Sequence, residues 1–154
     1  MKICILQRQR AVSVQRKALR ALAQRLLKKA FAKKPLPFET LWLILVNDKA
    51  MPTYKERTFG LLLQTDVITQ TYEAIPGVQA ATAEVILNIE RAQQEGARRP
   101  GGVAHEIAFY LAHGLDHLAG HEDHTPARRR TMHQRATAWL EAESGPDGWP
   151  ALCP

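Results

Sequence analysis

Two shortages in the sequence each exclude a class of protein. Only two cysteines occur among 154 residues, and Cys4 and Cys153 lie at opposite ends, so a scaffold held together by disulfides is excluded. The longest apolar run, "LWLILV" at residues 41–46, is far shorter than the roughly 18 residues that a membrane-spanning helix needs. We therefore expect a soluble protein in a reduced, cytoplasmic setting, with no membrane partner.

Acidic residues are absent from residues 1–38, although this segment holds eleven of the basic ones. A helix that presents Arg16, Arg20, Lys28 and Lys29 would form a positive surface able to hold a phosphate backbone, so these four residues are candidate RNA contacts. A solvated helix face explains the same charges equally well. Binding to a membrane surface fits less well, because the apolar residues between the charges are mostly alanine and leucine suited to a core.

The remaining composition is that of an ordinary globular protein. Hydrophobic residues make up 45% and charged residues 23%, which argues against disorder and against a fibrous architecture. The length of 154 residues is typical of one domain. We expect a single domain over residues 1–144, followed by a loose tail over residues 145–154.

Hydrophobic periodicity predicts an α+β chain. Strands are expected at residues 2–7, 40–47, 65–72 and 83–89, where β-branched and apolar residues cluster. Helices are expected at 13–32, as a turn within 51–60, shortly after 89, at 103–119, and from Thr125-Pro126 to 143. Gly120 is well placed to end the helix at 103–119. About four to five helices would therefore accompany four strands.

The stretch "HGLDHLAGHEDH" at residues 113–124 holds the strongest chemical signal. His113 and His117 are four apart, so both imidazoles project from one face of the helix and can share one metal ion. After the turn at Gly120, the candidates for a third ligand are His121, Asp123 and His124. Three protein ligands with a fourth position left for water are typical of catalytic zinc sites.

The motif differs from that of zinc peptidases. Those enzymes place glutamate directly after the first histidine as the general base, whereas this chain has Gly114 there. Asp116 lies between the two histidines and is a candidate to hold the metal-bound water or to support a ligand. An ordinary solvent-facing helix residue is an equal alternative for Asp116.

The motif "HGLDHLAGHED" resembles the His-Gly-x-x-His-Leu-x-Gly signature of the YbeY family, metal-dependent endoribonucleases implicated in ribosomal RNA maturation and ribosome quality control. "QTDVIT" at residues 64–69 is similar to the family's Pro-Thr-Asp-Val-Leu-Ser strand, and "AEVILNIERA" at 83–92 to its Gly-Asp-Ile-x-Ile-Ser segment and short helix. Order and spacing agree over about residues 40–140. The resemblance implies an α+β domain with a four-stranded mixed sheet and one zinc ion held at the end of a central helix.

Two departures from the family pattern concern the site itself. The family's third ligand is a histidine ten residues after the first, and Asp123 occupies that position here, with His124 one step later. Ungapped counting favours Asp123 as the ligand, whereas a bulge of one residue would favour His124. The family's catalytic arginine is replaced by Phe59 at the ungapped position, and Arg57 is the nearest basic residue, which makes it the candidate for that role.

The resemblance implies a zinc-dependent endoribonuclease that cuts single-stranded RNA, with ribosomal RNA or the small ribosomal subunit as its partner. Aromatic residues are only 6% of the chain, so base stacking has few candidates, among them Phe59, Tyr72 and Tyr110. A ribosome-assembly protein with a structural metal is the main alternative. A metallopeptidase-like hydrolase is a weaker one, because Gly114 replaces its general base.

Overall fold

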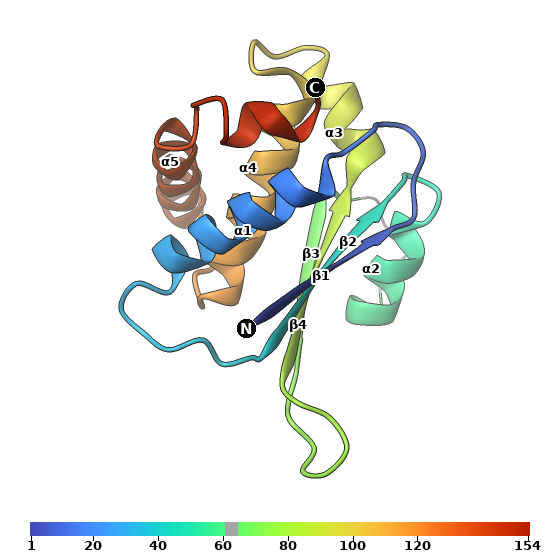
Figure 1. Cartoon of the computed structure of the whole chain (residues 1–154), viewed down its shortest axis with the longest axis vertical. Coiled ribbons are helices and arrows are strands. Elements are labelled where there is room, and N and C mark those ends of the chain that lie inside the picture. Colours follow the sequence, from blue (N-terminus) through green and yellow to red (C-terminus); the bar gives the residue numbers. More distant parts are fainter. Residues whose placement is uncertain (61–64) are drawn as a thin grey trace.

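The centre of the protein is a four-stranded mixed sheet (Figure 1), seen in a computed structural model that describes residues 1–60 and 65–154. Its strands run in the order β1-β2-β4-β3. β1 pairs in parallel with β2, β2 in parallel with β4, and β4 in antiparallel with the edge strand β3. The strands are β1 (Lys2–Gln7), β2 (Thr40–Val46), β3 (Val67–Tyr72) and β4 (Thr82–Asn88).

The two central strands are apolar on both faces because both faces are covered. Successive side chains of a strand point to opposite faces of the sheet. Leu41, Leu43 and Leu45 of β2 accordingly belong to the large core on one face, whereas Ile44 and Val46 belong to a smaller core on the other. A continuous apolar run such as "LWLILV" is thereby explained by its central position in the sheet.

Five α-helices cover this sheet in the described part of the chain. They are α1 (Arg16–Ala30), α2 (Met51–Phe59), α3 (Ile89–Gly96), α4 (Gly102–Leu118) and α5 (Pro126–Glu141). Figure 1 shows α1 and α4 on one face of the sheet, α5 outside α4, and α2 alone on the opposite face. Met51 and Tyr54 of α2 complete the smaller core, and the apolar faces of α1 and α4 complete the larger one.

The predicted α+β class, the four-stranded mixed sheet and the number of helices are confirmed. Element bounds differ from the expected ones by a few residues, for example at β3, which begins at Val67 rather than at 65. Predictions that concern Gln64 and the Phe59 side chain lie outside the described residues. Of the helices described, none is both long enough and apolar enough to cross a membrane.

The expectation of a loose tail after residue 144 is wrong. Residues Trp149–Leu152 form a short 3-10 helix, η1, that contacts α1 and α4. The side chain of Leu152 is fully buried in the large core, and its carbonyl oxygen accepts a hydrogen bond of 2.8 Å from the Gln15 backbone N–H. The composition of this segment concealed an apolar anchor, because residues 145–150 hold two glycines and two prolines, which are typical of loops.

We predict that Leu152→Ala destabilises the fold by about 2–5 kcal/mol, since the substitution leaves a cavity in a closed core. The free energy of unfolding, measured by urea denaturation with circular dichroism, checks this value. Val78→Ala is the matched control, because Val78 is 77% exposed and its loss is expected to change stability by less than about 0.5 kcal/mol. Equal stabilities of the two variants would mean that the C-terminal segment does not contribute to the core.

Candidate metal centre

Gly114 brings the helix that carries both motif histidines close to the sheet. A Cβ atom at this position would lie 2.9 Å from Cγ1 of Val85 on β4 and 3.1 Å from Cγ2 of Val67 on β3. Real Cβ atoms almost never approach other atoms this closely, so α4 packs at its present distance only with glycine here. His113 and His117 thereby share a cavity with residues of β3.

Gly120 reverses the chain directly after α4. Its φ of +100° lies in the left-handed region, which glycine adopts without the steric cost that a Cβ would add. The backbone N–H of His121 then donates to the Asp116 carbonyl at 3.3 Å, which fixes the returning chain against the helix end. The following residues carry the Asp123 carboxylate back toward the two histidines.

Ligand atoms of His113, His117 and Asp123 converge on one point. The Nε2 atoms of His113 and His117 lie 3.0 Å apart. Oδ2 of Asp123 lies 3.4 Å from Nε2 of His113 and 3.6 Å from Nε2 of His117. Zinc–nitrogen and zinc–oxygen bonds of roughly 2.0–2.1 Å place the ligand atoms of a tetrahedral site about 3.3 Å from one another. The donor set therefore fits a zinc ion in size and in chemistry.

The surroundings of the two imidazoles suit metal binding, and among the described residues the Nδ1 atom of His117 has a hydrogen-bond partner whereas that of His113 has none. Nδ1 of His117 lies 3.0 Å from the backbone carbonyl oxygen of His121, so Nδ1–H donates there and Nε2 is left for a metal. Burial lowers the pKa of His113 below its ordinary value, and the neighbouring His117 lowers it further, so this ring stays neutral at neutral pH. The His113 ring stacks on Phe109, with centroids 6.2 Å apart and the planes within 8°.

Of the three candidates for the third ligand, the structure brings Asp123 into the cluster, whereas His121 pairs with Asp116. His124 lines the same cavity, but its side chain is 73% exposed and its Nε2 lies 3.4 Å from a carboxylate oxygen of Glu122. This is the arrangement that ungapped counting favours. Three of the four metal ligands predicted from the sequence therefore meet in the described part of the chain. The fourth, His124, does not join them.

Asp116 is buried and engaged by two partners. Its Oδ1 lies 2.8 Å from Nδ1 of His121, and both carboxylate oxygens accept from Nε of Arg135 on α5 at 3.0 Å. The interpretation of Asp116 as a solvent-facing residue is wrong, because only 1% of it is exposed. Its carboxylate does not join the His113, His117 and Asp123 ligand atoms in the described cluster, and it instead ties the turn after α4 to α5.

The cluster lies in an open cavity of about 530 Å³ whose walls come from α2, β3, the end of α4 and the turn after it. Lys55 of α2 lines this cavity, whereas Arg57 does not appear among its lining residues. The Arg57 guanidinium is exposed and lies over the Tyr54 ring, 4.7 Å from its centroid. Lys55 is therefore the lysine or arginine in the described lining of this cavity, and the sequence motifs did not point to it.

Residues on α1 lie apart from this cavity. Arg16, Arg20 and Lys28 are exposed and Lys29 is half-buried, as expected for a solvated basic face. Nε of Arg20 also donates to the backbone carbonyl of Ile3 at 3.2 Å, which ties α1 to β1. The cavity lining contains no residue of α1 in the described part of the chain. The basic face of α1 therefore does not adjoin the candidate metal ligands.

Simple rules of helix geometry could have placed Phe109 and Lys55 at the site from the sequence alone. Phe109 precedes His113 by four residues, so the spacing that pairs His113 with His117 also places Phe109 beside His113. Lys55 and Arg57 are two residues apart and therefore point to different faces of a helix. A helix predicted through residue 59, rather than a turn and loop, would have shown that only one of them faces the sheet edge.

Fold and site together define a small α+β domain with a His-His-Asp cluster at the end of its central helix, as the sequence predicted. The sequence model of the family described as Endoribonuclease YbeY matches residues 4–143. This match covers most of the chain, and the protein belongs to that family.

Individual relatives are distant. A protein named Endoribonuclease YbeY from Helicobacter pylori (strain Shi470) is 31% identical over 86 residues, which are 56% of this chain and 60% of that protein. One from Deinococcus radiodurans is 29% identical over 113 residues, 66% of this chain and 72% of that protein. One from Anaeromyxobacter sp. (strain Fw109-5) is 28% identical over 101 residues, covering 66% of this chain and 53% of that protein. The match thus spans about half the length of the Anaeromyxobacter relative.

A solved structure supports the fold. A protein from Thermotoga maritima, known from its solution structure, superposes with a TM-score of 0.53 and is 20% identical, with 94% of each chain covered. At this level of identity the likeness concerns the fold alone.

We predict that Asp123→Ala lowers the zinc affinity by more than about 100-fold, because loss of a direct ligand exceeds the effect of removing an outer partner. His124→Ala is the matched control and is expected to retain about one zinc per chain. Mass spectrometry of the native protein, combined with competition against a chelator, measures both variants beside His117→Ala. Loss of zinc from His124→Ala with retention in Asp123→Ala would reverse the assignment of the third ligand.

Proposed function

We propose that this protein is a zinc-dependent endoribonuclease that cuts single-stranded RNA during ribosomal RNA maturation and ribosome quality control in the cytoplasm. The observation that carries the proposal is the convergence of His113, His117 and Asp123 in an open cavity beside Lys55. Membership of the endoribonuclease YbeY family supports the reaction class. Both cysteines are free thiols, which agrees with a reduced compartment.

The number of ligands favours a catalytic over a structural metal. Structural zinc sites are closed by four protein ligands, whereas catalytic sites have three and leave one position open. Three side chains form the cluster in the described part of the chain, and the cavity around them is open to the surface. A site of this kind admits a phosphodiester together with water.

Zinc in such a site acts as a Lewis acid and makes water nucleophilic near neutral pH. The protein contributes the geometry and the charge. His113 and His117 would supply ring nitrogens to the metal, and Asp123 would supply a carboxylate oxygen. Compared with three imidazoles, this ligand set makes the metal a weaker electrophile, so other positive groups in the cavity matter more.

Lys55 is the group best placed to stabilise the charge that develops on the phosphate. It lines the cavity that contains the three ligands, whereas Arg57, the residue expected from the sequence, packs on Tyr54. Positive side chains directed at a transferring phosphoryl group act mainly in the transition state. We therefore assign this part to Lys55 and give Asp116 a positioning part through His121 and Arg135.

Arg16, Arg20, Lys28 and Lys29 on α1 are proposed to bind the RNA backbone away from the cut. Their charge would attract ribosomal RNA, or the small ribosomal subunit, in a manner independent of base sequence. Because this face does not adjoin the cavity, it would contact a different part of the RNA from the scissile phosphate.

The alternative function is that of a ribosome-assembly protein with a structural metal. It is favoured by the aspartate at position 123, where the family pattern has a histidine ligand. A peptidase-like activity is disfavoured, because Gly114 stands where the general base would be and packs against Val67 and Val85. A test for RNA cleavage by the zinc-loaded protein distinguishes the endoribonuclease function from the ribosome-assembly function.

We predict that Lys55→Ala lowers kcat on a labelled single-stranded ribosomal RNA fragment by about 100-fold to 1000-fold, the usual effect of losing one group that stabilises the transition state. Arg57→Ala is the matched control from the same helix and is expected to retain kcat within about threefold, in line with its exposed position.

Zinc content and thermal unfolding of both variants show whether each still folds and binds metal. A large loss of kcat in Arg57→Ala alone would restore Arg57 as the catalytic residue. Absence of cleavage by the zinc-loaded wild type over a range of salt concentrations would favour the assembly protein.

We also predict that the double variant Arg16→Ala/Lys28→Ala weakens RNA binding and flattens its salt dependence. Each lost phosphate contact is expected to reduce the slope of log K against log salt by about 0.7 on single-stranded RNA. Fluorescence anisotropy at several salt concentrations measures the slope. Arg98→Ala is the control, because this side chain is also exposed, at 73%, but lies in the turn between α3 and α4. Equal slopes in wild type and double variant would mean that α1 does not bind RNA.

A further inference from the structure

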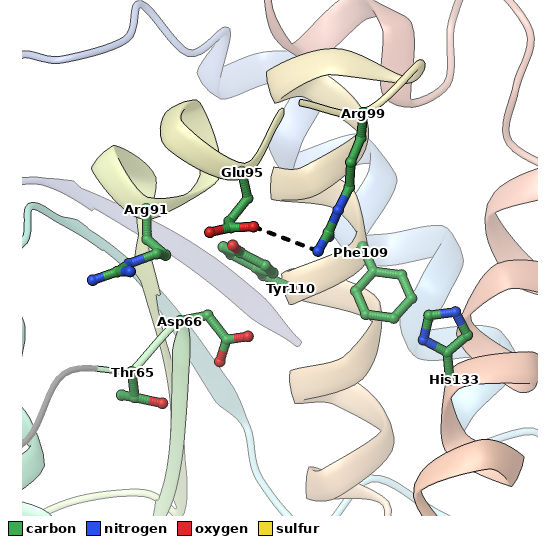
Figure 2. A pocket seen from close by; sticks show the side chains of 8 residues that line it. All are labelled: Thr65, Asp66, Arg91, Glu95, Arg99, Phe109, Tyr110 and His133. Atoms are coloured by element: carbon green, nitrogen blue, oxygen red, sulfur yellow. Dashed lines mark hydrogen bonds and ion pairs between the residues drawn. The ribbon is translucent and has the colours of Figure 1, made fainter. Parts of the chain in front are cut away.

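A second cavity of about 530 Å³ lies between α3, α4, α5 and the residues that directly precede β3. Its lining combines basic, acidic and aromatic side chains, which Figure 2 shows around one space. Arg99 extends into it from above, Phe109 and His133 lie side by side along one wall, and Asp66 points in from the opposite wall.

The rings of this cavity offer a surface for a planar ligand. Phe109 and His133 have centroids 5.0 Å apart and planes inclined at 51°, so a base can lie flat on one ring and against the edge of the other. Phe109 is also stacked on the candidate ligand His113. His133 is exposed and Phe109 is half-buried, so part of this aromatic wall is open to a ligand. Nucleobases stack on such side chains irrespective of sequence, because every base has a π-face.

The polar groups suit the hydroxyls and amines of a nucleoside better than a bare phosphate. Arg91 and Arg99 are each paired with carboxylates, Arg91 with Asp48 at 3.6 Å and Arg99 with Glu106 at 2.7 Å. Burial, and then the charges of Asp66, Glu106 and Glu95, hold the pKa of Tyr110 far above its usual value, so its hydroxyl stays protonated. A mixture of carboxylate acceptors and neutral donors matches ribose and base edges.

The cavity adjoins the one that holds the metal ligands. Thr65 and Asp66 line both, and the stacked pair of Phe109 and His113 joins their walls. One oxygen of Asp66 accepts from the Val67 backbone N–H at 2.8 Å, which directs this carboxylate at the junction. A group that bridges the two cavities therefore meets a carboxylate at the boundary.

A buried carboxylate oxygen lies beside the same aromatic wall. Glu106 is 2% exposed, its Oε1 pairs with Arg99, and its Oε2 has no hydrogen-bond partner among the described residues. Glu106 lines a smaller hollow of about 400 Å³ that shares Arg99, Phe109 and His133 with the cavity of Figure 2. An unpaired buried acceptor is costly, and a ligand that donates an N–H would satisfy it.

We propose that this cavity binds the nucleoside next to the scissile phosphate, with its base against Phe109 and His133 and its ribose hydroxyl donating to Asp66. The proposal rests on the nuclease function proposed above. It assigns the protein a contact with the 2′-hydroxyl, which is the group that distinguishes RNA from DNA. It also explains how a chain with few aromatic residues holds an unpaired strand at the point of cleavage.

The test is a titration with adenosine, guanosine, cytidine and uridine 5′-monophosphates, followed by NMR of the aromatic side chains. The expected result is binding that shifts the Phe109, Tyr110 and His133 signals and weakens at least about fivefold in His133→Ala. Each 2′-deoxynucleotide is expected to bind more weakly than its ribonucleotide. Gln134→Ala, an exposed neighbour of His133 on α5, is the control and should bind as the wild type does.

The same titration on the metal-free variant His117→Ala separates this inference from the nuclease proposal. Nucleotide binding without cleavage by the zinc-loaded wild type would retain the binding site and overturn the nuclease. Cleavage without shifts at Phe109 or His133, or with equal KM for wild type and His133→Ala, would retain the nuclease and overturn the binding site. Shifts centred on the basic residues of α1 would also overturn it.

Discussion

The close approach of α4 to the sheet at Gly114 is the contact on which the rest of the site depends. Any larger residue would press its Cβ into Val85 and Val67 and move the helix away from β3. His113 and His117 would then leave the wall that they share with that strand. Both cavities are lined by α4 and by the residues that precede β3. The glycine at position 114, which lets α4 approach the sheet, therefore defines where the chemistry can occur.

Local rules were sufficient for much of the fold and part of the candidate site. Apolar residues on both faces of β2 and β4 require central strands, and this pattern is visible without any structure. His113 and His117 are neighbours in any regular helix, so their pairing follows from spacing alone. The choice of Asp123 over His124 followed from counting residues, and it agrees with the turn at Gly120 because no extra residue is inserted there.

The remaining features depend on contacts between distant segments. Asp116 reads as a surface residue on its own helix, because its partner Arg135 lies nineteen residues away on α5. Leu152 reads as part of a polar tail, and only the space between α1 and α4 makes it a core residue. Lys55 and Arg57 are chemically alike, and the rotational position of α2 on the sheet determines which of them lines the cavity.

The Asp116 carboxylate also links elements that would otherwise move separately. It holds His121, two residues before Asp123, and at the same time holds Arg135 of the last helix. Proteins open locally in contiguous cooperative units, and a buried ion pair that joins two elements makes them part of the same unit. α5 and the turn that carries Asp123 are therefore expected to open together, and an opening that releases α5 would separate the Asp123 carboxylate from the two histidines of α4.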